Sequence, residues 1–253
     1  MTPSATPTDA ARLADLLGQA ERAVVLTGAG VSVPSGIPDF RTPGKGLWEK
    51  VDPMKVAHID AFRRSPDEFW TFYGQRFAML SEIEPNPAHD AVAELERRGL
   101  VRGVITQNID RLHRAAGSEN VIEVHGSIET SSCTACAAEF GLDEVEELFD
   151  RRGVAICSAC GGPVKPDVVL FGELLPEAAI DHATELAETA DLMLCVGSSL
   201  AVHPVAGLPR LTLEAGGRLA IVTKGETPYD SDAAVKLEGE VDEELTALLA
   251  ALG

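Results

Sequence analysis

The sequence predicts an α/β fold, with a Rossmann-like parallel sheet covered by helices on both faces and a smaller domain beside it. Three observations support this prediction. Short apolar runs alternate along the chain with segments of helical spacing. The runs are continuous rather than alternately apolar and polar, which is typical of parallel strands buried on both faces. Small or polar residues follow each run, as they do where the carboxyl ends of strands form a ligand site.

Six segments are predicted strands, and two segments between them are predicted helices. The helices cover residues 90–98 and 177–190, and Gly99 follows the first as a stop signal. The strands are Ala23–Thr27, 101–106, 121–124, 168–171, Leu192–Val196 and Arg218–Val222.

The residues that follow these strands form a candidate site. In an open parallel sheet the carboxyl ends of the strands share one edge, and ligands bind in the crevice there. Small or polar residues after all six strands are more than we expect by chance. In chain order the clusters are Gly28, Gln107-Asn108, His125-Gly126, Gly172-Glu173, Gly197-Ser198-Ser199 and Thr223.

Four of the five cysteines form two pairs, Cys133-x2-Cys136 and Cys157-x2-Cys160. This spacing predicts one structural Zn²⁺ held tetrahedrally by four thiolates. A redox disulfide fits poorly, because there are two pairs and neither opens a helix that follows a strand. The fifth cysteine, Cys195, lies in an apolar strand and is interpreted as a small core residue.

Two segments interrupt the alternation of strands and helices. Residues 42–85 are rich in aromatic side chains, and residues 128–165 contain the four paired cysteines. We expect a helical insertion and a zinc module that together form the smaller domain. The Rossmann-like part would then comprise residues 20–41, 86–127 and 166–250, and residues 1–253 would make a single catalytic domain.

Composition excludes several classes of function. The 253 residues carry 21 basic and 40 acidic side chains, a net charge of −19, whereas nucleic-acid binding needs a basic footprint. A lysine-rich protein substrate is compatible with this charge. No apolar run approaches the ~18 residues of a membrane span, and no secretory signal is visible. Paired cysteines without a leader favour thiolates in a reducing compartment, so we expect a cytoplasmic protein that contacts no membrane.

The glycine loop Gly28-Ala29-Gly30 follows the first strand, where backbone amides can approach a pyrophosphate. By itself this signal is weak, because an ordinary tight turn has the same sequence. Val33 stands where a full dinucleotide fingerprint has its third glycine, and no acidic residue ends a second strand about twenty residues later. These two departures argue against a hydride-transferring dehydrogenase.

Seven motifs together resemble the sirtuins, a family of NAD-dependent protein deacylases. The resemblance covers about residues 20–245, with the motifs in order and at fitting spacing. They are GAGVSVPSGIPDFR (28–41), TQNID (106–110), HG (125–126), the two CxxC pairs, VVLFGE (168–173), GSSL (197–200) and GETPYD (225–230).

The resemblance implies a role for several residues, with acylated-lysine proteins as substrates, NAD as co-substrate and one structural zinc ion. His125 would be the general base, and the other histidines (58, 89, 113, 182 and 203) are interpreted as structural. Asn108 would orient the ribose and a water molecule, and would be catalytic with His125. The NAD-binding residues would be Gly28, Ala29, Gly30, Ser32, Asp39, Phe40, Arg41, Trp48, Gln107, Asn108, Asp110, Gly197, Ser198, Ser199 and Thr223.

The peptide would add as an extended strand between residues 168–173 and 199–202, and mostly its backbone would be recognised. One departure from the family is Thr223, where the family commonly has Asn. We expect a monomer. Besides Tyr73 and Arg76, the substrate-binding residues would be Val168, Phe171, Gly172, Glu173 and Leu200.

Tyr73 and Arg76 are spaced to share one face of a helix. A solvated arginine beside a half-buried tyrosine is common, but Tyr-x-x-Arg at this place resembles the sirtuins that remove succinyl and malonyl groups. A guanidinium and a phenol can bind an acyl carboxylate. The expected activity is therefore deacetylation together with desuccinylation or demalonylation. The alternatives are a plain deacetylase, mono-ADP-ribosyl transfer at the same site, and a non-catalytic zinc-ribbon module.

Overall fold

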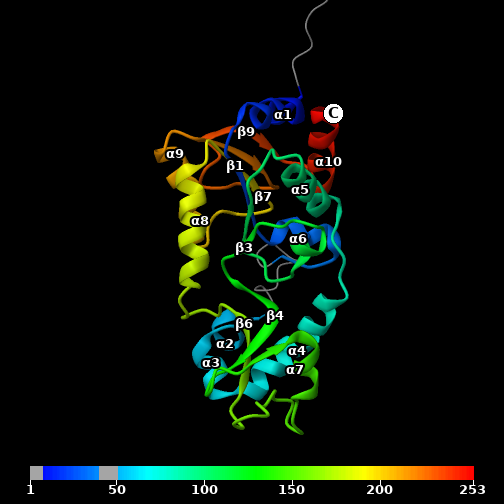
Figure 1. Cartoon of the computed structure of the whole chain (residues 1–253), viewed down its shortest axis with the longest axis vertical. Coiled ribbons are helices and arrows are strands. Elements are labelled where there is room, and N and C mark those ends of the chain that lie inside the picture. The colour runs from blue at the N-terminus through cyan, green and yellow to red at the C-terminus, as the bar shows by residue number, and fades with distance from the viewer. Residues whose placement is uncertain (1–7, 40–50) are drawn as a thin grey trace, which may run out of the picture.

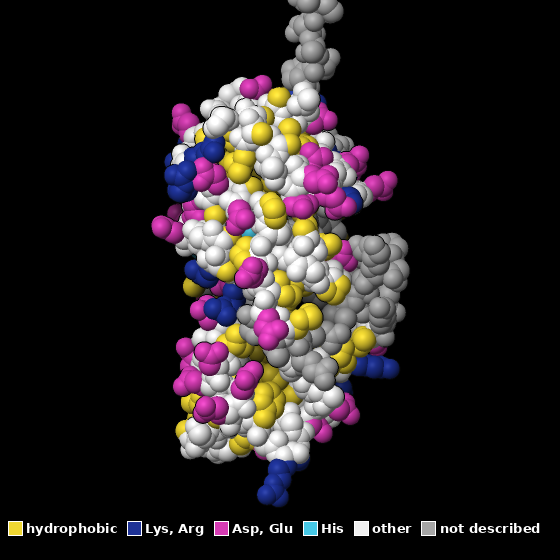
Figure 2. All heavy atoms as spheres, turned by 90° about the vertical axis from the view of Figure 1, so that its right-hand side faces the viewer, with side chains coloured by type: hydrophobic (Ala, Val, Ile, Leu, Met, Phe, Trp, Pro, Cys, Tyr) yellow, Lys and Arg dark blue, Asp and Glu magenta, His cyan; other side chains and the backbone are white. Residues whose placement is uncertain are grey.

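The computed structural model describes residues 8–39 and 51–253. The molecule is elongated, with a parallel sheet and its covering helices at one end and a smaller domain at the other (Figure 1). Helices α1 (Asp9–Gln19) and α10 (Val241–Leu252) lie together at the sheet end. Acidic side chains outnumber basic ones on the face in Figure 2, consistent with the net charge of −19.

The larger part is built on a six-stranded parallel sheet with the order β3-β2-β1-β7-β8-β9. Strand order reverses between β1 and β7, and such a switch point opens a crevice at the carboxyl edge. The strands are β1 (Ala23–Thr27), β2 (Val104–Thr106), β3 (Val121–Glu123), β7 (Leu192–Val196), β8 (Arg218–Val222) and β9 (Ala233–Leu237).

Both faces of the sheet are covered because its strands are apolar on both sides. In β1, Ala23 and Val25 pack into one core cluster with α1, α5 (Pro87–Arg97) and α10. Val24 and Leu26 pack into a second cluster with α8 (Glu177–Thr189) and α9 (Leu208–Glu214). This alternation is the two-residue period of a strand, and it explains why the apolar run is continuous.

The smaller domain joins the helical insertion to the cysteine module through one shared core. Phe62, Phe69 and Trp70 pack with Ile128, Val145 and Val164 in a third cluster. The insertion contributes α2 (Pro53–Val56), α3 (Ile59–Arg64) and α4 (Pro66–Ser81). The module contributes α7 (Leu142–Glu147) and an antiparallel sheet of order β5-β4-β6, made of β4 (Gly126–Cys133), β5 (Glu139–Gly141) and β6 (Val164–Val168).

Strand β4 connects the two parts of the molecule, as Figure 1 shows. It begins directly after His125 and ends at Cys133. Within the described ranges, further short helices are η1 (Ala29–Ser35), α6 (Leu112–Ala115) and η3 (Val205–Gly207). Among the described residues, no helix is both long and apolar enough to span a bilayer.

One predicted strand was wrong. Residues 168–171 do not join the parallel sheet, because β6 ends at Val168 and pairs antiparallel with β4 in the smaller domain. Val168 and Leu170 are apolar because they pack in the core of that domain. The sixth parallel strand is β9, which the sequence analysis missed. Its pattern is partly exposed and includes Lys236, as expected for a strand at the sheet edge.

Other boundaries shifted. The strand expected over 101–106 begins only at Val104, and the helix expected over 90–98 begins at Pro87. Asn86 caps this helix by accepting the amide of Ala88, and proline is favoured in the first turn because its missing N–H is not needed there. Helix α8 ends one residue before the predicted boundary.

Candidate functional site

Two glycine-containing loops meet at the switch point of the sheet. The amide of Gly30 donates to the carbonyl of Gly197 at 2.8 Å, and the amide of Gly28 donates to that of Val196 at 3.1 Å. A Cβ on Gly30 would lie 2.6 Å from the Gly197 oxygen. These glycines are therefore needed for the loops to touch, and both amides are already used inside the protein.

A hydrogen-bond network next to this contact joins Ser32, Asn108 and Asp110. All three are buried. The Asn108 amide donates from Nδ2 to the Gly28 carbonyl at 3.2 Å and to Ser32 Oγ at 3.0 Å. Ser32 Oγ donates to Asp110 Oδ2 at 2.7 Å. Because both Asn108 donors are used, its orientation is fixed and Oδ1 remains as the acceptor.

His89, in α5, contacts the same network through Ser32. Its Nδ1 accepts the Asn86 amide at 3.3 Å, so the neutral ring carries its proton on Nε2, which lies 3.3 Å from Ser32 Oγ. Burial lowers the pKa of His89 to about 4. Burial also raises the pKa of Asp110, against the opposing effect of its hydrogen bonds from Ser32 and the Leu112 amide. The polar floor of the site is thus held by neutral donors.

His125 lies at the end of the turn after β3, with its ring aimed at the neighbouring strand. Its Nδ1 lies 2.9 Å from the Gln107 carbonyl. A carbonyl only accepts, so Nδ1 donates and the neutral ring has its lone pair on Nε2. Burial lowers the pKa of His125, and the bond to Gln107 only partly opposes this effect. The ring is therefore a neutral base near pH 7.

Gln107 links β2 to the loop after β7. Its Nε2 donates to Ser198 Oγ at 3.0 Å. Ser198 is buried, whereas Ser199 is exposed beside it. Leu200 is buried with a φ of 50° and donates its amide to Ser198 Oγ. Thr223 is buried after β8, and its amide donates to the Leu237 carbonyl.

The segment after β6 reaches the site by a different route from the one predicted. Val168 pairs with Gly126, and the amide of Val169 donates to the His125 carbonyl at 2.8 Å. Glu173 Oε2 accepts the Leu170 amide at 2.9 Å and lies 3.1 Å from Lys165 Nζ. Pairing with β4 therefore brings 168–173 beside His125.

Lys165 fixes the turn from which Glu173 projects. Its Nζ also donates to the carbonyls of Pro166 and Val168, at 3.0 and 2.8 Å, so all three ammonium protons are used. The ion pair with Glu173 is largely shielded, with 14% and 25% of the two side chains exposed.

The expected acyl-selectivity pair lies on α4, where the structure describes only one of its side chains. Tyr73 is half-buried and stacks on Phe77, with ring centroids 5.3 Å apart. The side chain of Arg76 lies outside the described part, as do Phe40, Arg41 and Trp48. Ala29 and Asp39 are described and half-buried, and Ala29 begins η1.

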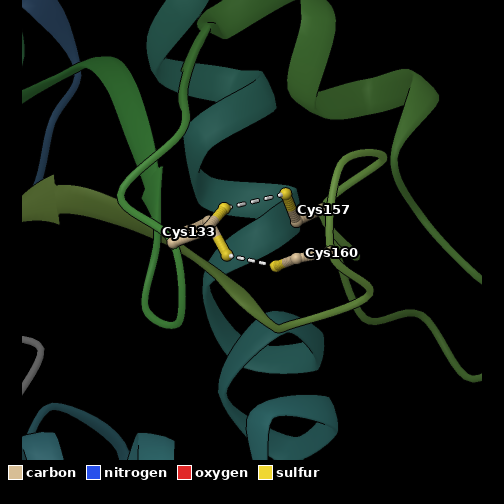
Figure 3. Close-up of side chains that lie close together, drawn as sticks. Cys133, Cys157 and Cys160 are labelled. Carbon is tan, nitrogen blue, oxygen red and sulfur yellow. Dashed lines mark hydrogen bonds between the residues drawn. The ribbon is translucent and has the colours of Figure 1, made fainter.

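The four paired cysteines converge on one point, confirming the predicted metal site. Their Sγ atoms all lie within 4.8 Å of one another, with Cys133 and Cys160 3.4 Å apart and Cys136 and Cys157 3.7 Å apart. Sulfurs bound tetrahedrally at about 2.3 Å would be about 3.8 Å apart. Figure 3 shows Cys133 facing Cys157 and Cys160 from the opposite loop. The donor set fits one zinc ion, with no open position.

Several residues that shape the site gave no functional signal in the sequence. His89 and His113 were interpreted as structural, and both are buried with their rings 4.9 Å apart. In the described chain, His113 Nδ1 is one of two buried side-chain atoms without a partner. Lys165, within β6, was not singled out because a single lysine in a strand gives no functional signal in the sequence. Only its three contacts reveal its role.

The structure is that of a Rossmann-type protein with a half-buried neutral histidine at the carboxyl edge of the sheet and a module that contains four clustered cysteines. The comparisons agree. A model of the Sir2 family matches residues 28–204. The chain therefore belongs to the Sir2 family.

The similarity extends over nearly the whole chain. NAD-dependent protein deacetylase 1 of Pyrobaculum aerophilum is 46% identical over 237 residues, which cover 94% of this chain and 92% of that protein. NAD-dependent protein deacylase 2 of Archaeoglobus fulgidus is 45% identical and covers 94% of both chains. The solved structure of Sir2 with a p53 peptide and NAD⁺ is 42% identical in sequence, with a TM-score of 0.88. The match covers 94% of this chain and 96% of that chain.

Proposed function

We propose that the protein is an NAD-dependent protein-lysine deacylase with acetyl-lysine among its substrates. The observation that carries this proposal is the state of His125, a half-buried neutral ring whose Nδ1 donates to Gln107 and whose Nε2 is left as a base. The similar proteins named above are NAD-dependent deacetylases and deacylases. Their coverage of almost all of both chains supports the same activity here.

NAD, when bound, supplies an electrophilic ribose carbon from which nicotinamide departs. The acyl-lysine amide oxygen would attack that carbon, and the acyl group would then pass to a ribose hydroxyl while the bond to the lysine nitrogen breaks. One water molecule is consumed, so acyl-lysine, NAD and water would give free lysine, nicotinamide and 2′-O-acyl-ADP-ribose. Such a transfer needs a base that removes a hydroxyl proton near pH 7, and His125 Nε2 has the protonation state for it.

The remaining residues would bind and orient the two substrates. Asn108 would accept a hydrogen bond from a ribose hydroxyl or a water at Oδ1, because both of its donors are used. Asp110 would hold the carboxamide end of NAD, and Ser32 would act by fixing Asp110 and Asn108. The closed tetrathiolate site would keep zinc out of the chemistry.

Removal of acidic acyl groups is a finer proposal for the same site. Tyr73 and Arg76 lie one turn apart on α4, the helix whose aromatic residues pack in the core of the smaller domain. Arg76 would pair with the distal carboxylate of succinyl- or malonyl-lysine. A charge-assisted hydrogen bond contributes roughly 1.5–3 kcal/mol, so Arg76→Met should slow desuccinylation by at least about tenfold and deacetylation much less. Equal slowing of desuccinylation and deacetylation would mean that Arg76 has a structural role and that the protein is a plain deacetylase.

The test is mass spectrometry of acetyl-, succinyl- and malonyl-lysine peptides incubated with the enzyme, with and without NAD. We expect a loss of acyl mass only in the presence of NAD, with O-acyl-ADP-ribose among the products. ADP-ribose attached to the protein or peptide with the acyl group retained would identify a mono-ADP-ribosyltransferase instead. Acyl loss without NAD would refute the proposed function.

A further inference from the structure

The helical insertion is hydrogen-bonded directly to the segment that follows β6. The amide of Phe171 donates to the carbonyl of Ala57 at 2.8 Å, and the amide of Ile59 donates to that of Phe171 at 3.0 Å. These bonds form a parallel bridge between His58 and Phe171. One edge of the segment is therefore set by the chain between α2 and α3.

The ring of His58 lies against Gly172. A Cβ on Gly172 would lie 2.7 Å from His58 Nε2 and 2.8 Å from Cε1, and the φ of Gly172 is 85°. Both the free space and the backbone conformation therefore require glycine next to this ring. The ring cannot turn away freely, because its Nδ1 accepts the Asp60 amide at 3.1 Å and caps α3.

The same segment is tied to the backbone of the base. Val169 donates its amide to the carbonyl of His125, two residues before Phe171 meets the insertion. The segment 169–172 is thus fixed at both ends, by the His125 turn and by His58. A shift of the helical insertion would therefore move the edge of segment 169–172, on which an added peptide strand would pair. The switch point between β1 and β7 would stay in place.

We propose that His58 is a positioning residue for the acyl-lysine peptide, setting through Phe171 and Gly172 the strand edge on which the peptide backbone docks. This inference rests on the proposed function. A strand added to an edge is held mainly by main-chain hydrogen bonds, so its affinity depends on the placement of that edge. The expected NAD-binding residues that the structure describes lie on other loops, so His58 should affect the peptide more than NAD.

The variant His58→Asn separates the two roles of this side chain. Asparagine is a preferred helix cap, so it keeps an acceptor for the Asp60 amide while removing the ring from Gly172. We expect KM for an acetyl-lysine peptide to rise about tenfold, as for the loss of one or two net hydrogen bonds. KM for NAD, kcat and Tm should stay near the wild-type values. His182→Asn, at an exposed histidine of α8, is the matched control and should change none of them.

A double-mutant cycle tests whether the effect passes through Gly172. Gly172→Ala should weaken peptide binding, measured by fluorescence anisotropy of a labelled acetyl-lysine peptide. It should weaken binding less in the His58→Asn background, because the ring that its Cβ meets is gone. Additive effects would contradict the proposed route.

Two results separate the inference from the function on which it rests. If wild-type protein turns over no acyl-lysine peptide with NAD, the proposed function fails. If wild-type turnover is normal but His58→Asn leaves peptide KM unchanged, or raises both KM values and lowers Tm together, the positioning role fails.

Discussion

At the scale of single residues, hydrogen bonds select the protonation state on which the chemistry depends. Gln107 contributes its carbonyl to His125 and its side-chain amide to Ser198, so one residue orients the base and the neighbouring loop. Asn86 fixes the tautomer of His89 in the same manner. Around His125 and Asn108 the donors and acceptors are matched between neutral groups, because each hydrogen bond has a defined partner.

The first prediction concerns His125. His125→Ala should lower kcat for deacylation by about 10²- to 10⁴-fold, the usual loss for a general base, while NAD binding persists. Because burial lowers the pKa of His125, the base stays neutral at more acidic pH than an exposed histidine. The acid limb of kcat/KM in the wild type should therefore lie below about pH 6.5. Near-normal turnover by a folded variant, or an acid limb above that pH, would contradict this role.

Sequence patterns identified the residues at the sheet edge but not their contacts. Gly28 and Gly30 were expected to open the backbone toward a pyrophosphate, and their amides instead donate to Val196 and Gly197. A glycine loop looks the same in sequence whether it approaches a ligand or a second loop. His58 gave no signal either, because its role depends on Gly172, more than a hundred residues away in the chain.

A second prediction tests the contact between the two glycine loops. Gly30→Ala should lower Tm and weaken NAD binding together, because its Cβ would lie 2.6 Å from the Gly197 oxygen. Gly18→Ala is the matched control, since a Cβ there meets nothing within 4 Å and the residue lies in α1. Within a helix, alanine is more stable than glycine by roughly 0.5–1 kcal/mol, so the Gly18→Ala control should raise Tm slightly. Thermal melts with and without NAD would show both effects, and an unchanged Gly30→Ala protein would mean that the loops need not touch.

At the scale of elements, buried apolar strands were predictable and strand partners were not. The strand β1 was predicted with its bounds because both of its faces are buried. Residues 168–171 are also apolar, but Val168 and Leu170 belong to another core, and β9 was missed because an edge strand carries charge. Hydrophobicity predicts that a strand is buried, but it does not predict which strand it pairs with. Here β6 pairs with β4, so the pairing depends on the path of β4 after His125.

A third prediction concerns the zinc module. Cys133 and Cys157 are buried in the core that also contains Phe62 and Trp70. Cys133→Ala should therefore abolish zinc binding and unfold the smaller domain, because binding energy at such a site is folding energy. Cys195→Ala, in β7, is the control and should retain one zinc per chain. Elemental analysis and circular dichroism would measure both, and wild-type protein without zinc after chelator-free purification would contradict the assignment.

At the scale of the whole molecule, buried neutral histidines make the fold sensitive to acid. Burial lowers the pKa of His89 to about 4 and that of His113 to about 3. The unfolded chain takes up these protons near pH 6.5, whereas the folded chain does not. Their contribution to stability is therefore present above pH 6.5 and is lost as the pH falls toward 4.

The fourth prediction follows from this linkage. Between pH 7 and pH 5 the two histidines should lower the free energy of unfolding by about 2 kcal/mol each, from the pKa shifts and about 1.4 kcal/mol per pKa unit. Near pH 5 these two rings should contribute about two protons to the uptake on unfolding. Denaturant titrations at several pH values would measure it. A stability that does not fall over this range would mean that one or both rings are protonated in the folded protein.

Lysine deacylation by this chain should consume NAD, and the stoichiometry of the reaction is the decisive measurement. Nicotinamide released and free lysine formed should be counted in the same reaction on an acetyl-lysine peptide. We predict one nicotinamide for each lysine unmasked, and no lysine unmasked when NAD is omitted. Lysine formed without nicotinamide, or nicotinamide released while the peptide keeps its acetyl group, would contradict the account.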